Sequence, residues 1–114
     1  MGQDFSTKQL MPTDEACEVM ETASLRQRVI IDCSHGNSNK DHTKQPGVFE
    51  SVINQRVSGN ENIVGVMLES NINSGNQPLG DDPTALRYGV SITDACVEWS
   101  KTEEIILWAD SQLA

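Results

Sequence analysis

The stretch Ile30-Ile31-Asp32-Cys33-Ser34-His35-Gly36-Asn37-Ser38-Asn39-Lys40 decides how we interpret this chain. Its first half, led in by Val29, is an apolar run typical of a buried strand. Its second half is rich in Gly, Asn and Ser, which is typical of a loop. His35 lies where the strand gives way to the loop. In a parallel α/β fold this point is the carboxyl end of a strand, where ligands and catalytic groups collect.

Strand-like and helix-like segments alternate along the rest of the chain. Apolar side chains recur at helical spacing over residues 13–25 and 46–57, which predicts two helices there. Ile63–Leu68 is continuously apolar, as a strand covered on both faces should be. Ser91–Val97 is a third, less apolar strand candidate, and a last helix is predicted from Thr102 onward. The order of these elements predicts parallel βαβ units in an α/β fold.

A long polar loop, residues 70–90, separates the second and third strand candidates. Loops of this length within a compact domain are usually functional or disordered. A sheet of three strands is also thin for two covering layers of helices. We therefore interpret residues 1–114 as a single partial domain, a piece of a larger fold, and predict that residues 1–11 are flexible.

Composition and charge exclude several functional classes. Eight Lys and Arg residues against seventeen Asp and Glu give a formal charge of −9, which argues against a nucleic-acid surface. No apolar run approaches the about 18 residues that a membrane-spanning helix needs. Cys17, Cys33 and Cys96 are odd in number, lack C-x-x-C spacing and lie among apolar neighbours. They favour buried thiols in the reducing cytoplasm.

Three residues with metal-binding side chains, His35, Glu69 and Asp94, fall on or after the three strand candidates. If the strands are parallel neighbours, these side chains converge at one end of the sheet. One imidazole and two carboxylates suit a divalent ion such as Mn²⁺ or Fe²⁺. Such an ion polarises a carbonyl oxygen as a Lewis acid. The residues also have plainer interpretations: a loop histidine that makes hydrogen bonds, a solvated Glu, and an Asp that caps a turn.

Two alternatives remain open at this point. His42 is a competing ligand, although the surrounding Lys40–Lys44 has the composition of a solvated loop. Cys33 and His35 form a possible nucleophile pair, and a small buried hydrophobe is the competing interpretation of Cys33. The sequence contains no phosphate-binding loop, dinucleotide fingerprint or G-x-S-x-G motif.

The opening stretch, from Ile31 to Lys40, resembles a signature of class I 3-deoxy-D-arabino-heptulosonate 7-phosphate (DAHP) synthase. Val64-Gly65-Val66-Met67-Leu68-Glu69-Ser70, then Gly75-Asn76-Gln77, then Tyr88-Gly89 with Ser91-Ile92-Thr93-Asp94-Ala95-Cys96 continue the resemblance in order. The matching segment covers residues 29–99. Several separate motifs in register make the resemblance specific.

This resemblance implies a transferase of aromatic amino acid biosynthesis that joins phosphoenolpyruvate to erythrose 4-phosphate, the first step of the shikimate pathway. It implies a TIM (β/α)₈ barrel, of which this chain supplies about strands 6–8 and their helices. It further implies that His35, Glu69 and Asp94 match three of the family's ligands to a divalent metal. A fourth ligand, a cysteine on an early strand, has no counterpart here.

The departures from the family pattern concern substrate binding. A full barrel needs about 250 residues, and the basic segments that hold both substrate phosphates have no match in this chain. We therefore expect a truncated synthase that is inactive alone, binds the metal weakly, and works as a homo-oligomer or paired with the missing barrel part. The alternative is a non-catalytic interaction or remnant protein that pairs with a full-length synthase.

Overall fold

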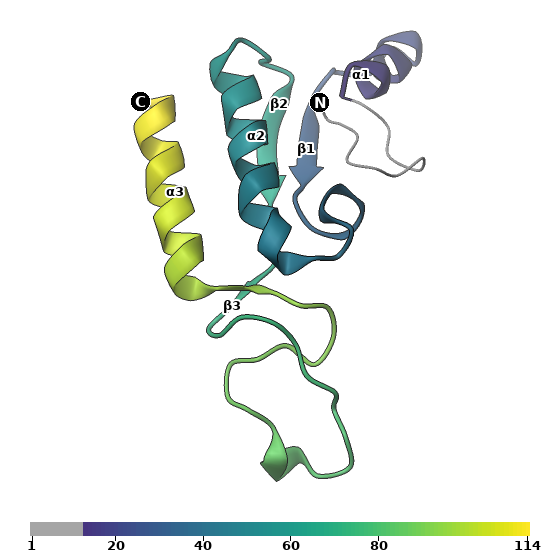
Figure 1. The fold of residues 1–114 in the computed structure, drawn as a ribbon. Helices are drawn as coiled ribbons and strands as arrows, with labels where there is room; N and C mark the ends of the chain where they lie inside the picture. Colours follow the sequence, from purple (N-terminus) through teal and green to yellow (C-terminus); the bar gives the residue numbers. More distant parts are fainter. Residues whose placement is uncertain (1–12) are drawn as a thin grey trace.

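The computed structural model describes residues 13–114, so the segment 1–11, predicted to be flexible, lies outside the described residues. Three α-helices and four strands follow one another in mixed order (Figure 1). Two 3₁₀ turns, His35–Ser38 and His42–Lys44, lie between β1 and α2, and a third, Pro83–Ala85, lies in the long loop. Their bounds are α1 Thr13–Thr22, β1 Val29–Asp32, α2 Gln45–Val57, β2 Ile63–Met67, β3 Ser70–Asn71, β4 Val97–Glu98 and α3 Trp99–Leu113.

The strands form two separate pairs, both parallel. β1 pairs with β2, and their register is shifted by one residue between Val29 and Ile30. β3 pairs with β4 through Ser70 opposite Val97 and Asn71 opposite Glu98. Among residues 13–114 the strands close no barrel, and the structure is an open α/β arrangement. The predicted parallel βαβ unit is therefore present for β1, α2 and β2.

The core lies between the first sheet and the two long helices. α2 covers one face of β1 and β2, and α3 packs alongside α2 (Figure 1). The buried core residues come from these elements and from the end of β1: Cys33, Val48, Phe49, Val52, Ile53, Ile63, Ile105 and Ala109. Side chains alternate along the strands, so Ile30 and Met67 remain 68% and 40% exposed on the other face, where Gly65 lies opposite Ile30. That face is apolar and uncovered by residues 13–114.

The sequence explains the limits of α2. Pro46 occupies the first turn, where its missing N–H costs nothing and its fixed φ suits a helix. The apolar side chains of α2 recur on one stripe that faces the core. Ser58 ends the helix, and Gly59 follows with φ +119°, a conformation that L side chains rarely adopt.

The third strand prediction was wrong. Of Ser91–Val97 only Val97 is in a strand, and that strand is the two-residue β4. The preceding residues bond to the loop instead of to β2: Gln77 N–H donates to the Ser91 carbonyl, and Gly75 and Cys96 exchange two backbone hydrogen bonds. Because the loop satisfies these backbone groups, no ladder forms beside β2.

The helix predictions were correct in place but not in length. α1 ends at Thr22 rather than near Leu25, and α3 begins at Trp99, before the predicted Thr102. None of the helices among the described residues has the length and apolar character needed to cross a membrane.

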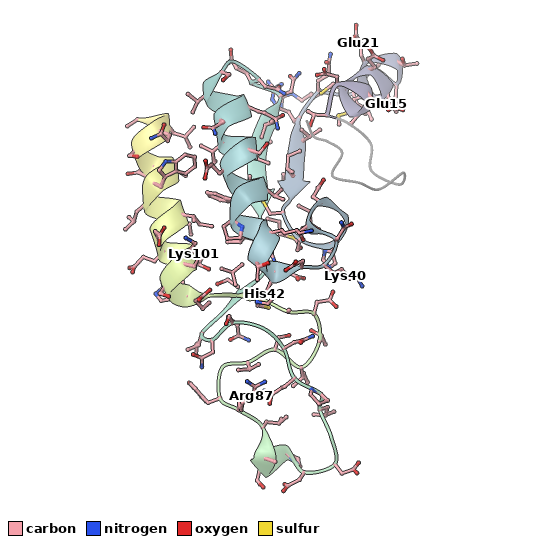
Figure 2. All side chains as sticks on the ribbon, in the orientation of Figure 1. Glu15, Glu21, Lys40, His42, Arg87 and Lys101 are labelled. Atoms are coloured by element: carbon pink, nitrogen blue, oxygen red, sulfur yellow. The ribbon has the colours of Figure 1, made fainter. Side chains whose placement is uncertain are left out.

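Arg87 lies inside the long loop (Figure 2), where its backbone N–H donates to Gln77 Oε1 and its guanidinium donates to the Asn76 carbonyl.

Candidate metal centre

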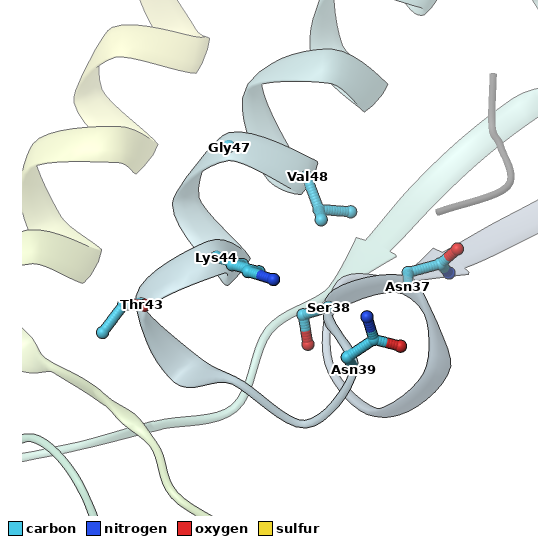
Figure 3. A pocket seen from close by; sticks show the side chains of 7 residues that line it. All are labelled: Asn37, Ser38, Asn39, Thr43, Lys44, Gly47 and Val48. Carbon is cyan, nitrogen blue, oxygen red and sulfur yellow. The ribbon is translucent and has the colours of Figure 1, made fainter. Parts of the chain in front are cut away.

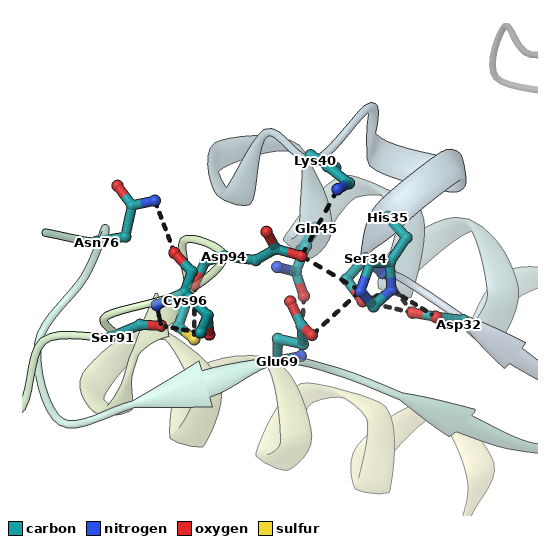
Figure 4. A network of polar contacts seen from close by, with 11 residues as sticks. Asp32, Ser34, His35, Lys40, Gln45, Glu69, Asn76, Ser91, Asp94 and Cys96 are labelled. Carbon is teal, nitrogen blue, oxygen red and sulfur yellow. Dashed lines mark hydrogen bonds and ion pairs between the residues drawn. The ribbon is translucent and has the colours of Figure 1, made fainter. Parts of the chain in front are cut away.

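The three predicted ligands come from different parts of the fold and meet at the carboxyl ends of β1 and β2 (Figure 4). His35 begins the 3₁₀ turn that follows β1. Glu69 lies between the end of β2 and the start of β3. Asp94 comes from the irregular segment before β4, and not from a strand as predicted.

The ligand atoms of these residues all lie within 4.8 Å of one another. His35 Nε2 is 3.4 Å from Glu69 Oε1 and 3.5 Å from Asp94 Oδ2. The three side chains are 43%, 27% and 42% exposed, so solvent and small ions reach them. Lys40 Nζ is 4.0 Å from Asp94 Oδ2 and is the nearby cation that sequence reasoning did not single out.

A local hydrogen-bond network at the end of β1 holds His35. Asp32 Oδ1 accepts hydrogen bonds from the backbone N–H and the hydroxyl of Ser34, and Asp32 Oδ2 lies 2.9 Å from His35 Nδ1. Asn37 Nδ2 donates to the Asp32 carbonyl at 2.7 Å. His35 itself has φ +50°, an uncommon conformation for a residue with a side chain. The network therefore holds a strained backbone in place.

The backbone of Glu69 is fixed on both sides. Its N–H donates to Gln45 Oε1 at 3.0 Å, and its carbonyl accepts from the Val97 N–H at 3.0 Å. Gln45 is 1% exposed at the start of α2. The carboxylate of Glu69 is thus placed by bonds to α2 and to β4.

Asp94 depends on contacts within the loop. Asn76 Nδ2 donates to the carbonyl of Thr93 at 2.8 Å, and the Cys96 thiol donates to the carbonyl of Asp94 at 3.6 Å. These bonds shape the turn that carries Asp94 toward His35 (Figure 4). The loop, predicted to be functional or disordered, therefore adopts a defined conformation and positions Asp94.

The acidic surroundings change the ionisation of the network. The hydrogen bond that His35 donates to Asp32 raises the pKa of His35 above its ordinary value, and the charges of Asp32, Glu69 and Asp94 add to this effect. Partial burial works to raise the pKa of Asp32. Hydrogen bonds from Ser34 and His35 together outweigh it, so that the pKa lies below its usual range.

The alternatives weighed on sequence alone are resolved by geometry. His42 begins a separate 3₁₀ turn and does not belong to the group of ligand atoms found among residues 13–114. Cys33 is fully buried, and burial raises the pKa of its thiol to about 12. It packs in the core and does not form a nucleophile pair with His35.

A hollow of about 420 Å³ opens beside the first turn of α2 (Figure 3). Its lining residues come from the 3₁₀ turns His35–Ser38 and His42–Lys44, the segment between them, and α2: Asn37, Ser38, Asn39, Thr43, Lys44, Gly47 and Val48. The Ser38 hydroxyl is buried without a hydrogen-bond partner. None of the three candidate ligands lines this hollow, so it is separate from the metal centre.

Sequence reasoning missed two residues that position the site, Asp32 and Gln45. Asp32 carries a usable signal, because an Asp three residues before a loop His is within hydrogen-bond reach in a tight turn. The sequence holds no such signal for Gln45, because its hydrogen-bond partner Glu69 lies 24 positions later in the chain.

Fold and site together define an α/β segment with a histidine and two carboxylates at the carboxyl ends of parallel strands. The family model described as "DAHP synthetase I family" matches residues 5–107. The chain therefore belongs to the DAHP synthetase I family.

Its similarity to individual members is high but partial. It is 54% identical over 97 residues to a Tyr-sensitive phospho-2-dehydro-3-deoxyheptonate aldolase of Enterobacter agglomerans, covering 83% of this chain and 46% of the relative. Identity to the Tyr-sensitive enzyme of Escherichia coli K12 is 50%, over 83% of this chain and 27% of the relative. The chain thus spans less than half the length of these relatives.

The fold comparison agrees with the sequence comparison. A solved phospho-2-dehydro-3-deoxyheptonate aldolase from Francisella tularensis SCHU S4 superposes with a TM-score of 0.81 at 38% identity, over 88% of this chain and 28% of that chain. The described α/β unit therefore has the same arrangement as one segment of a larger enzyme.

Proposed function

We propose that this chain supplies His35, Glu69 and Asp94 as ligands to the divalent metal of a DAHP synthase. That enzyme joins phosphoenolpyruvate to erythrose 4-phosphate. The observation that carries the proposal is the convergence of one imidazole and two carboxylates from three distant segments within 4.8 Å. The family match and the names of the relatives support the reaction.

The donor set fits a small divalent ion. Metal–ligand distances of about 2.0–2.2 Å place neighbouring donors about 3.0–3.5 Å apart. His35 Nε2 lies 3.4 and 3.5 Å from the two carboxylate oxygens. One nitrogen and two oxygen ligands favour Mn²⁺ or Fe²⁺. When bound, such an ion supplies a Lewis acid for polarising a substrate carbonyl.

The residues of this chain provide the ion with a negative, preorganised site. Glu69 is held from two sides by its backbone, and Asp94 is held by the loop that Asn76 braces. A cation between these carboxylates removes their mutual repulsion. The chain has no matching groups for two substrate phosphates, so we propose that substrate placement comes from the remainder of the barrel.

We further propose that β1, β2 and the segment before α3 correspond to strands 6–8 of a (β/α)₈ barrel. The uncovered apolar face, with Ile30 and Met67 exposed, supports a partner that completes the sheet. That partner is the remaining barrel part, on the same or another polypeptide. The free cysteines of residues 13–114 support a reducing, cytoplasmic setting.

Titration of the purified chain with Mn²⁺, followed by electron paramagnetic resonance, tests the ligand assignment. We expect saturable binding that His35→Ala weakens by at least about tenfold, as loss of metal-site groups commonly does. His42→Ala is the matched control and leaves binding unchanged. Absence of saturable binding, or equal losses in the two variants, would overturn the assignment.

Complementation tests the enzymatic role separately. The chain is mixed with a separately expressed N-terminal barrel part of a synthase, and product formation is measured. We expect activity only in the mixture, and expect Glu69→Gln to abolish it. If no ratio gives activity while the chain still co-sediments with full-length synthase, the non-catalytic interaction protein becomes the better description.

A further inference from the structure

The geometry points to a positioning role for Asp32, which lies outside the three candidate ligands. Asp32 Oδ2 is 2.9 Å from His35 Nδ1, on the side of the imidazole away from Glu69 and Asp94 (Figure 4). The opposite nitrogen, Nε2, faces those two carboxylates. The two nitrogens of one ring therefore have distinct tasks.

The proton positions follow from the contacts. Ser34 Oγ also lies 3.0 Å from Nδ1, but its single hydrogen already serves Asp32 Oδ1 at 2.5 Å. Both remaining neighbours of Nδ1, the Asp32 carboxylate and the Ser34 oxygen, can then only accept a hydrogen bond. Nε2 also faces acceptors, Glu69 Oε1 at 3.4 Å and Asp94 Oδ2 at 3.5 Å, but these contacts are longer than the 2.9 Å contact of Nδ1 with Asp32. The single hydrogen of a neutral His35 therefore belongs on Nδ1.

We propose that Asp32 fixes His35 in the Nδ1–H tautomer and orients its ring, which leaves the Nε2 lone pair directed at the space between Glu69 and Asp94. The value of this arrangement rests on the proposed function, because a bound metal would need the Nε2 lone pair of His35. A carboxylate behind a ligating histidine fixes ring orientation and increases ligand basicity in metal sites generally.

The chain contains internal controls for this contact. Asp41 and Asp82 make the same turn as Asp32: one carboxylate oxygen accepts from the backbone N–H and the hydroxyl of a Thr two residues later. Only at Asp32 does the second oxygen contact an imidazole. The turn itself therefore does not require the histidine, and the contact with His35 is an additional feature.

The decisive measurement is the ¹⁵N chemical shifts of the His35 ring in the metal-free full chain, at a pH where the imidazole is neutral. We expect the Nδ1–H tautomer in the natural chain and in Asp41→Asn. Asp32→Asn should shift the population toward Nε2–H, because an amide can donate to Nδ1. Unaltered circular dichroism shows that the variants are folded.

Mn²⁺ affinity is measured on the same three proteins. We expect Asp32→Asn to weaken binding about 10–100-fold, and Asp41→Asn, which removes the same charge, to leave it unchanged. An Nε2–H tautomer in the natural chain, or no change of tautomer in Asp32→Asn, overturns the inference whatever the metal result. A tautomer change without Mn²⁺ binding in any protein overturns the proposed function and supports the role of Asp32 in fixing the ring.

Discussion

The backbone N–H of Glu69 donates a 3.0 Å hydrogen bond to the side-chain oxygen of Gln45, a residue 24 positions earlier that is 1% exposed. This bond joins the first turn of α2 to the end of β2. It places a candidate ligand by means of a buried side-chain amide. The position of Glu69 is therefore set by the packing of a helix.

Gln45→Met keeps the size of this side chain and removes its acceptor. We expect the free energy of unfolding to fall by about 1–3 kcal/mol, because the partly buried Glu69 N–H loses its partner. Gln55→Met is the matched control in the same helix. It removes only a bond to Ser51, and we expect a change within about 0.5 kcal/mol. Urea unfolding checks both, and equal losses would contradict the role of Gln45.

The network around His35 makes stability depend on pH. Its raised pKa means that the folded state favours the protonated imidazole. The stabilisation is therefore complete below the ordinary pKa of about 6.5 and is lost as pH rises through the higher folded value. Urea unfolding of the metal-free chain between roughly pH 5 and pH 8 should show this decline. His35→Gln should flatten it and His42→Gln should not; a flat profile in the natural chain would contradict the prediction.

Gly89 and Gly80 separate backbone strain from steric overlap. Both have positive φ, +71° and +68°, so alanine at either position costs about 1–2 kcal/mol. At Gly89 an added Cβ would also lie 2.7 Å from Ile72 Cβ, whereas at Gly80 it meets nothing within 4 Å. We expect Gly89→Ala to cost about 1–3 kcal/mol more.

Hydrogen exchange of the Asn73 amide is a direct readout, because that N–H donates to the Gly89 carbonyl at 2.8 Å. Exchange should accelerate in Gly89→Ala well beyond Gly80→Ala. Identical rates in the two variants would show that Ile72 moves aside without cost.

Cys33 should be the less reactive of the two thiols near the site. It is fully buried with a thiol pKa of about 12, while Cys96 is only partly buried. We expect iodoacetamide to modify Cys96 at least about tenfold faster in the folded chain, as followed by mass spectrometry of the peptides. In urea the rates should become similar. Fast native modification of Cys33 would restore the nucleophile interpretation.

The parts of the fold with local signals were predictable from sequence. The apolar runs predicted β1 and β2, and the apolar stripe at helical spacing together with Pro46 predicted α2. The three candidate ligands were singled out because each follows or lies on an apolar run, and the structure brings them together. Their use as metal ligands stays a prediction.

The remaining features depend on bonds between distant residues. Asp94 sits on a loop because the Asn76 side chain and the Gln77 backbone N–H donate to the carbonyls of Thr93 and Ser91, which a strand would have paired. No periodicity reports such side-chain bonds. The contact of Gln45 with Glu69 is invisible for the same reason. The contact of Asp32 with His35 is local and its spacing is a usable signal, but Asp41 and Asp82 make the same turn without such a contact, so the turn alone does not predict it.

Only Leu68 and Glu69 separate β2 from β3, and this short junction restricts how the chain can change in length. One inserted residue there would turn the Glu69 side chain to the opposite face, because strand side chains alternate. An insertion among the exposed residues 79–82 would lengthen the loop far from His35. Natural and engineered length variants that keep the three side chains together should therefore accumulate at 79–82 and be missing at 67–70.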